Sequence, residues 1–298
     1  MNILLTGANG FIGRNVCKYL KNQGETVFGV DLHDESRCEC DKYFSCDLST
    51  EAVNDIFENN KIDAVVHLAS DMRHEPYTVE VVRNNCVSMQ RLLELSEKYE
   101  ISAFVELSSL PVIGSPVTHP IKEDHPLKPP TVYHVTKHAQ ELLAEYAFYT
   151  FGLRTVSLRI CAPVGEGVNP KTIFPTFIRK ALNNEDITLI GKGGRKQTYI
   201  HVNDIAQAIY KSINSKAQGV YNLASYNLIS NYELAKKVIE LTGSKSQIVF
   251  LDKEDKEENR VWDVCIDKLK ADTGYEPLID IDTAITEFAE ITKKSMEE

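Results

Sequence analysis

The stretch ILLTGANGFIG, residues 3–13, decides the fold that we expect of this chain. The apolar residues 3–5 indicate a buried strand, and Gly7, Gly10 and Gly13 follow at intervals of three residues. A chain that turns sharply from a strand into a helix while phosphate oxygens approach its backbone needs residues without a Cβ there. Because the spacing is G-x-x-G-x-x-G and not G-x-G-x-x-G, it predicts a slightly longer loop before the helix. The alternative is an ordinary turn between a strand and a helix.

The residues that follow this turn favour a dinucleotide site. The helix predicted over Phe11–Asn22 ends near Gly24, and residues 26–30 form a second apolar strand that ends at Asp31. An acidic side chain at that point can accept hydrogen bonds from both hydroxyls of a ribose, whereas it would repel a 2′-phosphate. The sequence therefore predicts NAD as cofactor and not NADP. The alternative for Asp31 is a solvated strand end.

Composition excludes several classes of function. The chain has 298 residues, of which 43% are hydrophobic and 26% are charged, as in an ordinary globular protein. Its net charge of −10 argues against a nucleic-acid partner, because such binding depends on clusters of Lys and Arg. No apolar stretch approaches the length of a bilayer span, and a core strand begins at once after Met1. We therefore expect a cytoplasmic protein without a membrane partner or a signal peptide.

The cysteines raise the question of a metal. Seven of them are scattered along the chain, which is typical of reduced thiols in the cytosol. His33, Cys38, Cys40 and Cys46 follow the second strand and carry groups that bind zinc. Their C-x-C spacing is not that of a zinc knuckle, so we expect no metal, although the sequence alone leaves a small structural site open.

Strands and helices alternate along the rest of the chain. Apolar strands are expected at residues 62–69, 103–109 and 154–160, and residues 79–99 have helical periodicity. Such alternation predicts a doubly wound parallel sheet of the α/β class. After Gly165 the elements become shorter, and a smaller second domain should be concentrated there.

A tyrosine and a lysine supply candidate acid/base chemistry. Tyr133 and Lys137 are four residues apart on a predicted helix and share a face, with Thr131 as its N-cap. Lowering a phenol pKa from about 10 to about 7 requires about 4 kcal/mol. An ammonium at about 4 Å supplies about that much at an effective dielectric constant near 20, and oxidised nicotinamide would add positive charge. We therefore expect Tyr133 to act as a base at neutral pH.

Position makes this pair more than a chance occurrence of Y-x-x-x-K. The helix follows a strand that ends in Ser108-Ser109, whose hydroxyl can bind the same substrate oxygen. The chain also carries the glycine-rich turn, so the three features together predict redox chemistry on a bound nicotinamide.

The motifs together resemble the extended short-chain dehydrogenase/reductase superfamily, in particular its NAD-dependent nucleotide-sugar epimerase/dehydratase group, which is typified by UDP-glucose 4-epimerase. The motifs that carry the resemblance are residues 6–13, Asp31, Asp47-Leu48, 67–70, Asn84-Asn85, Ser108-Ser109, 133–137, Arg159, 163–165, 201–204, 267–270 and 274–277. The resemblance implies a Rossmann NAD-binding domain over residues 1–165 and about 199–226. It implies a smaller, mostly C-terminal α/β substrate domain over about 166–198 and 227–298.

The resemblance also implies roles for individual residues. Tyr133 is the acid/base, Lys137 lowers its pKa and holds the nicotinamide ribose, and Ser109 is the matching hydroxyl. Coenzyme contacts are implied for Gly7, Asn9, Gly10, Phe11, Ile12, Gly13, Asp31, Asp47, Leu48, Leu68, Ala69, Ser70, Asn85, Tyr133, Lys137, Ala162 and Pro163.

The chain departs from the family pattern at the substrate. The dehydratases place Asp-Glu after the catalytic hydroxyl residue, whereas Leu110-Pro111 stand here, which argues against sugar dehydration. Ala162 replaces an Asn that often meets the diphosphate, Gln197-Thr198 replace an Arg-Asp pair, and His201 is interpreted as a packed structural residue. Residues 72–74 would border the sugar. The predicted substrate contacts are Arg73, Ser109, Leu110, Ala162, Arg195, Gln197 and Arg260, with Lys196 as another possible source of positive charge.

The resulting hypothesis is an NAD-dependent epimerase of a nucleotide-linked sugar, whose coenzyme is recycled within each turnover. The alternative is an NAD-dependent dehydrogenase or reductase of a sugar or small carbonyl compound, with exchanging coenzyme. A regulatory subunit without catalysis fits poorly with Ser109, Tyr133 and Lys137 all present. The resemblance further implies a homodimer that pairs the helices near residues 80–98 and 134–149.

Overall fold

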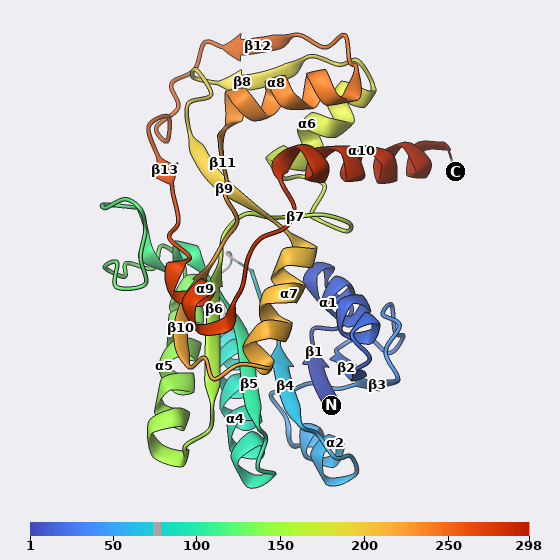
Figure 1. The fold of residues 1–298 in the computed structure, drawn as a ribbon, viewed down its shortest axis with the longest axis vertical. Coiled ribbons are helices and arrows are strands. Elements are labelled where there is room, and N and C mark those ends of the chain that lie inside the picture. The colour runs from blue at the N-terminus through green and yellow to red at the C-terminus, as the bar shows by residue number, and fades with distance from the viewer. Residues whose placement is uncertain (74–78, 298) are drawn as a thin grey trace.

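The computed structural model describes residues 1–73 and 79–297 and divides into a larger and a smaller part (Figure 1). The larger part is built on a seven-stranded sheet in the order β10-β6-β5-β4-β1-β2-β3, with every pair of neighbours parallel. Its strands are β1 (Asn2–Thr6), β2 (Thr26–Asp31), β3 (Lys42–Ser45), β4 (Ala64–His67), β5 (Ala103–Ser109), β6 (Thr155–Ile160) and β10 (Gly219–Leu223). The strand order reverses between β1 and β4, which is where such sheets bind ligands.

Helices cover both faces of this sheet, because its strands are apolar on both sides. One face packs against α1 (Phe11–Asn22), α7 (Val202–Ile213) and α9 (Asp267–Thr273), and the other against α2 (Asn54–Glu58), α4 (Ser88–Lys98) and α5 (Val132–Phe151). Shorter helical segments are η1 (Glu51–Val53), α3 (Val79–Val82), η2 (Arg83–Val87) and η3 (Leu110–Ile113).

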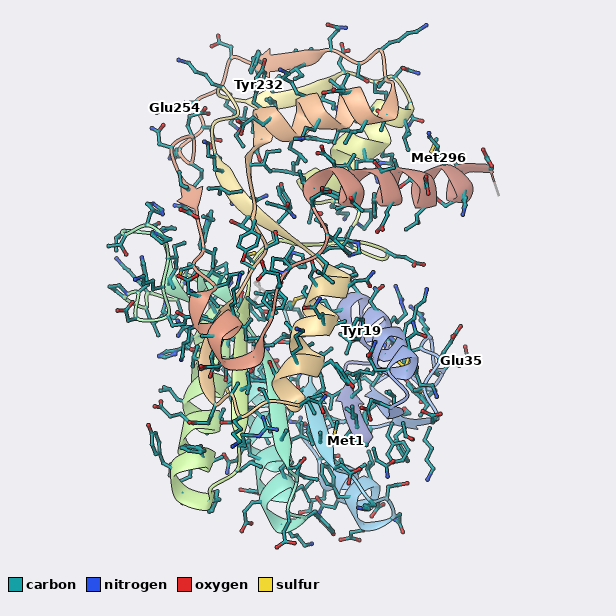
Figure 2. All side chains as sticks on the ribbon, viewed as in Figure 1. Met1, Tyr19, Glu35, Tyr232, Glu254 and Met296 are labelled. Carbon is teal, nitrogen blue, oxygen red and sulfur yellow. The ribbon has the colours of Figure 1, made fainter. Side chains whose placement is uncertain are left out.

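The smaller part has a hydrophobic core of its own, which includes Phe174, Leu234 and Ile285. Its helices are α6 (Ile173–Leu182), α8 (Asn231–Thr242) and α10 (Ile281–Glu297). Its strands are β7 (Pro163–Val164), β8 (Ile187–Ile190), β9 (Lys196–His201), β11 (Asn227–Ser230), β12 (Ile248–Leu251) and β13 (Val261–Trp262). In Figure 2, Tyr232 and Glu254 mark its end farthest from Met1.

Several predicted elements are confirmed, and others differ in detail. The helix Phe11–Asn22 and the strand at residues 103–109 have the expected bounds. The helix expected over residues 79–99 contains a π-helical segment, Arg83–Val87, between α3 and α4. The structure packs α9 on the large sheet through Leu269, although the predicted boundary placed this segment with the smaller part.

The cysteines do not gather around one point. Cys38 lies in the core on one face of the large sheet and Cys46 in the core on the other face. All seven cysteines are free thiols, and the Sγ atoms of Cys17 and Cys38 are 3.4 Å apart. Within residues 1–73 and 79–297, no group of three or more His, Cys, Asp or Glu side chains is arranged to hold a metal ion.

The length and polarity of the helices bear on whether the chain could span a membrane. In the part of the chain that the structure describes, none of them is both long enough and apolar enough to cross a membrane.

Candidate active site

The glycine-rich turn packs tightly between β1, β4 and α1. Gly7 has a φ of +67°, and a Cβ added there would lie 2.7 Å from the backbone nitrogen of Ala69. A Cβ added to Gly13, in the first turn of α1, would lie 2.1 Å from the carbonyl oxygen of Gly7. Both contacts are with backbone atoms, which cannot rotate away as a flexible side chain could. The N-terminus of α1 can therefore approach the turn this closely only with glycine at these positions. The arrangement suits a pyrophosphate group at the start of α1.

The carboxylate of Asp31 is held at the end of β2. Its Oδ2 accepts a hydrogen bond from the backbone N–H of Asn9 at 3.0 Å, and its Oδ1 accepts one from the N–H of Leu32 at 2.9 Å. The ring of His33 contacts the same Oδ1 at 2.8 Å. These bonds fix an acceptor group at the place where the fold puts the adenosine ribose, so the residues fit NAD.

Tyr133 is positioned by the first turn of α5. Its helix begins after Thr131, whose hydroxyl accepts a hydrogen bond from the N–H of His134. Side-chain hydrogen bonds from Ser70 and Ser109 lower the pKa of the phenol, but burial outweighs them and raises the pKa of Tyr133 to about 12. The expectation is that Lys137 and the oxidised coenzyme together make Tyr133 a base at neutral pH. The protein groups leave Tyr133 protonated at neutral pH, and positive charge from the oxidised coenzyme would have to supply the rest.

Lys137 lies one helical turn further along α5 and is buried. Its Nζ donates a hydrogen bond to the carbonyl oxygen of Leu107 at 2.7 Å. Burial lowers the pKa of Lys137 from its ordinary value, while Glu106 and Glu141 oppose that shift. The lysine is thus held at a fixed place behind the tyrosine, where its charge acts in a medium of low dielectric constant.

A buried ion pair fixes α5 against the sheet. Arg159 of β6 donates to both carboxylate oxygens of Glu141, at 2.8 Å each, and the Ser108 hydroxyl donates to Oε1 of Glu141 at 2.6 Å. Because Glu141 is four residues after Lys137 and on the same helix face, these bonds also set the position of the lysine and the tyrosine.

The turn, Asp31 and the Tyr133–Lys137 couple line one cavity of about 1250 Å³. The cavity runs along the carboxyl ends of the large-sheet strands and reaches the smaller part at Arg195 and Trp262. The predicted site residues that line it are Gly7, Gly10, Phe11, Ile12, Gly13, Asp31, Asp47, Leu48, Leu68, Ala69, Ser70, Arg73, Ser109, Leu110, Tyr133, Lys137, Ala162, Pro163, Arg195 and Gln197.

Two of the predicted coenzyme contacts lie behind the cavity wall instead. Asn9 is buried and donates from Nδ2 to the carbonyl oxygen of Glu35 at 2.9 Å, while its Oδ1 accepts from the N–H of Arg37 at 2.7 Å. Asn85 is fully buried, accepts from the N–H of Asp71 at 2.7 Å and donates to the Thr136 hydroxyl at 2.9 Å. Both side chains hold the loops that carry lining residues.

The predicted substrate contacts also include residues that line the cavity and one that does not. Arg260 does not line the cavity: it forms an ion pair with Glu257 and donates to the Ser115 hydroxyl at 3.0 Å. Arg73 does line it and is held by Asp71, with Nε to Oδ1 at 2.8 Å. Of the residues 72–74 expected at the sugar, His74 lies outside the described residues.

Sequence reasoning missed several lining residues. Lys171, Phe174 and Trp262 come from the smaller part, and Asn84 comes from the helix that follows β4. No local motif marks the first three, because they meet the site only through the packing of the smaller part. Asn84 could have been predicted, because it stands next to Asn85 in one of the motifs that carry the family resemblance.

Charge is distributed unevenly along the cavity. Arg195 and Lys171 line its end in the smaller part, and within the described residues the buried Nε of Arg195 has no hydrogen-bond partner. Asp71 also lines the cavity, and hydrogen bonds from Arg73 and Asn84 lower its pKa to about 2. The end formed by Arg195 and Lys171 therefore suits an anionic group such as a diphosphate.

Comparison with known proteins agrees with this geometry. The sequence model of the family described as "NAD dependent epimerase/dehydratase family" matches residues 3–224. The chain is 28% identical to UDP-glucose 4-epimerase of Bacillus subtilis, over 85% of this chain and 86% of that protein. It is 27% identical to dTDP-D-glucose 4,6-dehydratase of Dictyostelium discoideum, over 80% of this chain but only 62% of that longer protein.

A solved structure has the same fold. UDP-glucose 4-epimerase of Thermotoga maritima, solved with UDP-glucose, superposes with a TM-score of 0.88 at 24% identity, covering 99% of this chain and 100% of that one. Relatives of this chain therefore include both epimerases and dehydratases.

Proposed function

Because the chain belongs to the NAD dependent epimerase/dehydratase family, we propose that it is an epimerase of a nucleotide-linked sugar. One observation carries the proposal: Ser109, Tyr133 and Lys137 line the same cavity as the glycine-rich turn, and the cavity continues to Arg195. When bound, NAD supplies an acceptor that takes a hydride from a sugar carbon and returns it within one turnover.

Tyr133 moves the proton in this proposal. Its phenolate oxygen takes the proton from the sugar hydroxyl at the carbon that is oxidised and returns it when that carbon is reduced. Ser109, which hydrogen-bonds Tyr133, holds the same sugar oxygen, and the charge of Lys137 stabilises the phenolate. Inversion follows if the keto sugar turns in the cavity before the hydride returns to its opposite face.

The residues next to Ser109 favour epimerisation over dehydration. Elimination of water needs an acid and a base beside the sugar, and Leu110 and Pro111 occupy the positions after Ser109. Of the carboxylates that line the cavity, Asp31 and Asp47 lie at the adenosine end, and Asp71 is ionised and bound by Arg73. Among the described lining residues, no carboxyl group is placed to protonate a leaving hydroxyl.

The nucleotide end of the substrate is assigned to the smaller part. Arg195 and Lys171 would bind the diphosphate, and Trp262 offers a flat apolar face nearby for the base. The cavity volume of about 1250 Å³ is large enough for a dinucleotide and a sugar nucleotide end to end.

A panel of sugar nucleotides tests the proposal. Purified protein is incubated with UDP-, GDP-, dTDP- and CDP-linked hexoses without added coenzyme, and the products are followed by NMR. We expect one class to interconvert with its epimer while NADH absorbance stays flat. Stoichiometric NADH would favour the dehydrogenase alternative, and a 4-keto-6-deoxy product would establish a dehydratase.

We further propose that the protein is a cytoplasmic homodimer. Apolar side chains at positions 135, 142, 146 and 149 share an exposed face of α5, and Leu142 and Tyr146 are 52% and 56% exposed. The neighbouring α3–α4 region exposes Val79, Val82 and Val87. Seven free cysteines are consistent with a reducing compartment. Leu142→Glu should convert a dimer to a monomer in sedimentation at micromolar concentration; a monomeric wild type would contradict the proposal.

A further inference from the structure

A buried carboxyl group lies in the layer between the large sheet and α5, the helix that carries Tyr133 and Lys137. It has no role in the reaction described above. Glu106 lies on β5, one residue before the Leu107 carbonyl that binds Lys137, and its side chain is 0% exposed. Ser108, two residues further and on the same face of the strand, bonds Glu141 of α5. Glu106 therefore faces the helix that carries the catalytic pair.

The carboxyl oxygens of Glu106 lack good hydrogen-bond partners in the described part of the chain. Within the described residues, neither of its oxygens makes a hydrogen bond of normal geometry, although the hydroxyl of Ser157, its register neighbour on β6, favours the ionised form. An ionised carboxylate buried in this way costs several kcal/mol, on the order of the penalty for any unpaired buried charge. Phe104, two residues earlier on the same face, shows that an apolar side chain fits this layer. Packing alone does not explain a carboxyl group here.

The groups that face Glu106 leave one cation without a close counter-charge. Arg159 of β6 and Glu141 of α5 bind each other, and His67, its register neighbour on β4, is neutral because burial lowers its pKa to about 3. No carboxylate of the described chain comes within ion-pair distance of Lys137, whose Nζ bonds a backbone carbonyl. Glu106 and Lys137 are thus the two groups in this layer whose charges are not neutralised by direct contact.

Each of these two groups influences the protonation of the other. Burial lowers the pKa of Lys137, and Glu106 is the largest of the charges that oppose this. Burial raises the pKa of Glu106 to about 7, and Lys137 is the largest of the groups that oppose that shift. Glu106 also raises the pKa of Tyr133. The Cys86 thiol of η2 is kept neutral, because burial raises its pKa.

We propose that Glu106 is a positioning residue whose buried carboxylate balances the charge of Lys137 and thereby sets the pH range in which Tyr133 exchanges its proton. The inference rests on the proposed function, because it needs Tyr133 as the acid/base. It adds a proton-holding group beneath the catalytic helix that acts only through Lys137 and Tyr133 and does not touch the substrate.

The charge-removing variant Glu106→Gln tests this through the pH profile of kcat/KM. Below about pH 6 Glu106 is protonated and the two enzymes should coincide. Above that pH the variant lacks the counter-charge, so Lys137 should lose its proton earlier and the alkaline limb should move to lower pH by about one unit. Glu106→Asp, which retains the carboxylate, should restore most of the wild-type limb. Superimposable profiles, or an equal loss of activity at every pH, would overturn the proposal.

A second readout does not need turnover. Ultraviolet difference titration of the NAD-loaded protein against its Tyr133→Phe variant reports the tyrosinate of Tyr133 alone. Because Glu106 raises the pKa of Tyr133, this tyrosinate should form at lower pH with Glu106→Gln over the pH range in which Lys137 is still charged, and an unmoved titration would contradict the coupling. If no sugar is epimerised, the proposed function fails while this titration still decides the role of Glu106. If Glu106→Gln does not fold, Glu106→Leu removes the same charge with apolar packing and should give the same displacement.

Discussion

The close contact between α1 and the glycine-rich turn at Gly13 gives a quantitative prediction for Gly13→Ala. The added Cβ would lie 2.1 Å from the carbonyl oxygen of Gly7 and 2.9 Å from that of Ala8. Ordinary contact begins near 3.4 Å, so α1 must move away from the turn by about 1.3 Å, the difference between 3.4 and 2.1. Such overpacking costs about 1–3 kcal/mol, and the better helix propensity of alanine returns about 1 kcal/mol. We expect a net loss of stability of about 0–2 kcal/mol.

The effect on NAD should exceed the effect on stability. A displacement of about 1 Å lengthens the hydrogen bonds from the start of α1 to the pyrophosphate beyond useful range, and each such charge-assisted bond is worth about 1.5–3 kcal/mol. Loss of one bond therefore weakens NAD binding by about 10- to 100-fold. Calorimetric titration of coenzyme-free protein measures the affinity, and thermal unfolding measures the stability at roughly 2–4 °C per kcal/mol.

Gly24→Ala is the matched control. Gly24 has a φ of +81°, and a Cβ there would meet no atom within 4 Å. Alanine at this conformation costs about 1–2 kcal/mol of strain, but it leaves the turn untouched. This variant should lose stability and keep its NAD affinity. If Gly13→Ala binds NAD as tightly as the wild type, then close packing of α1 on the turn does not position the coenzyme, and the reasoning is refuted.

Three further changes have defined outcomes. Glu141→Gln leaves Arg159 buried without its carboxylate and should cost about 3–5 kcal/mol in denaturant unfolding, so a loss below about 1 kcal/mol would contradict the buried pair. Because the folded pKa of Asp71 is lowered to about 2, its ion pair with Arg73 stabilises the protein above the unfolded pKa and is lost as pH falls from about 4 to 2. Asp71→Asn should flatten that acid dependence in unfolding measured at each pH, and an unchanged slope would exclude it. Arg195→Met should raise KM for the sugar nucleotide about tenfold with little change in kcat, and a fall in kcat alone would remove Arg195 from the diphosphate site.

The dinucleotide half of the site could be predicted from sequence because its parts are local. Residues 3–13 contain the strand, the turn and the helix start, and Asp31 ends the next strand of the same βαβ unit. Each of these features depends on a backbone requirement, such as the positive φ of Gly7. The side chains that brace the loops were harder to assign. Asn9 and Asn85 lie in the right segments, yet they bond neighbouring loops and do not face the cavity.

The substrate half and the electrostatics could not be predicted in the same way. Lys171 and Trp262 reach the cavity only because β9 and β13 pair and α6 packs beside them, which are contacts between segments distant in sequence. The pKa of Tyr133 also depends on burial, a tertiary property that the pairing of Tyr133 with Lys137 on one helix face does not reveal. Glu106 gave no signal, because a glutamate in a strand is ordinarily exposed on a solvated face.

The central claim is that Tyr133 exchanges a proton with the sugar beside the coenzyme-binding turn. The most direct measurement compares NAD-loaded wild type and Tyr133→Phe on the sugar nucleotide that the panel identifies, with epimer formation followed by NMR. We predict that the variant keeps its NAD and its fold and loses activity by at least about 100-fold, the usual contribution of a positioned acid/base. Epimerisation at the wild-type rate by the NAD-loaded variant would contradict the claim.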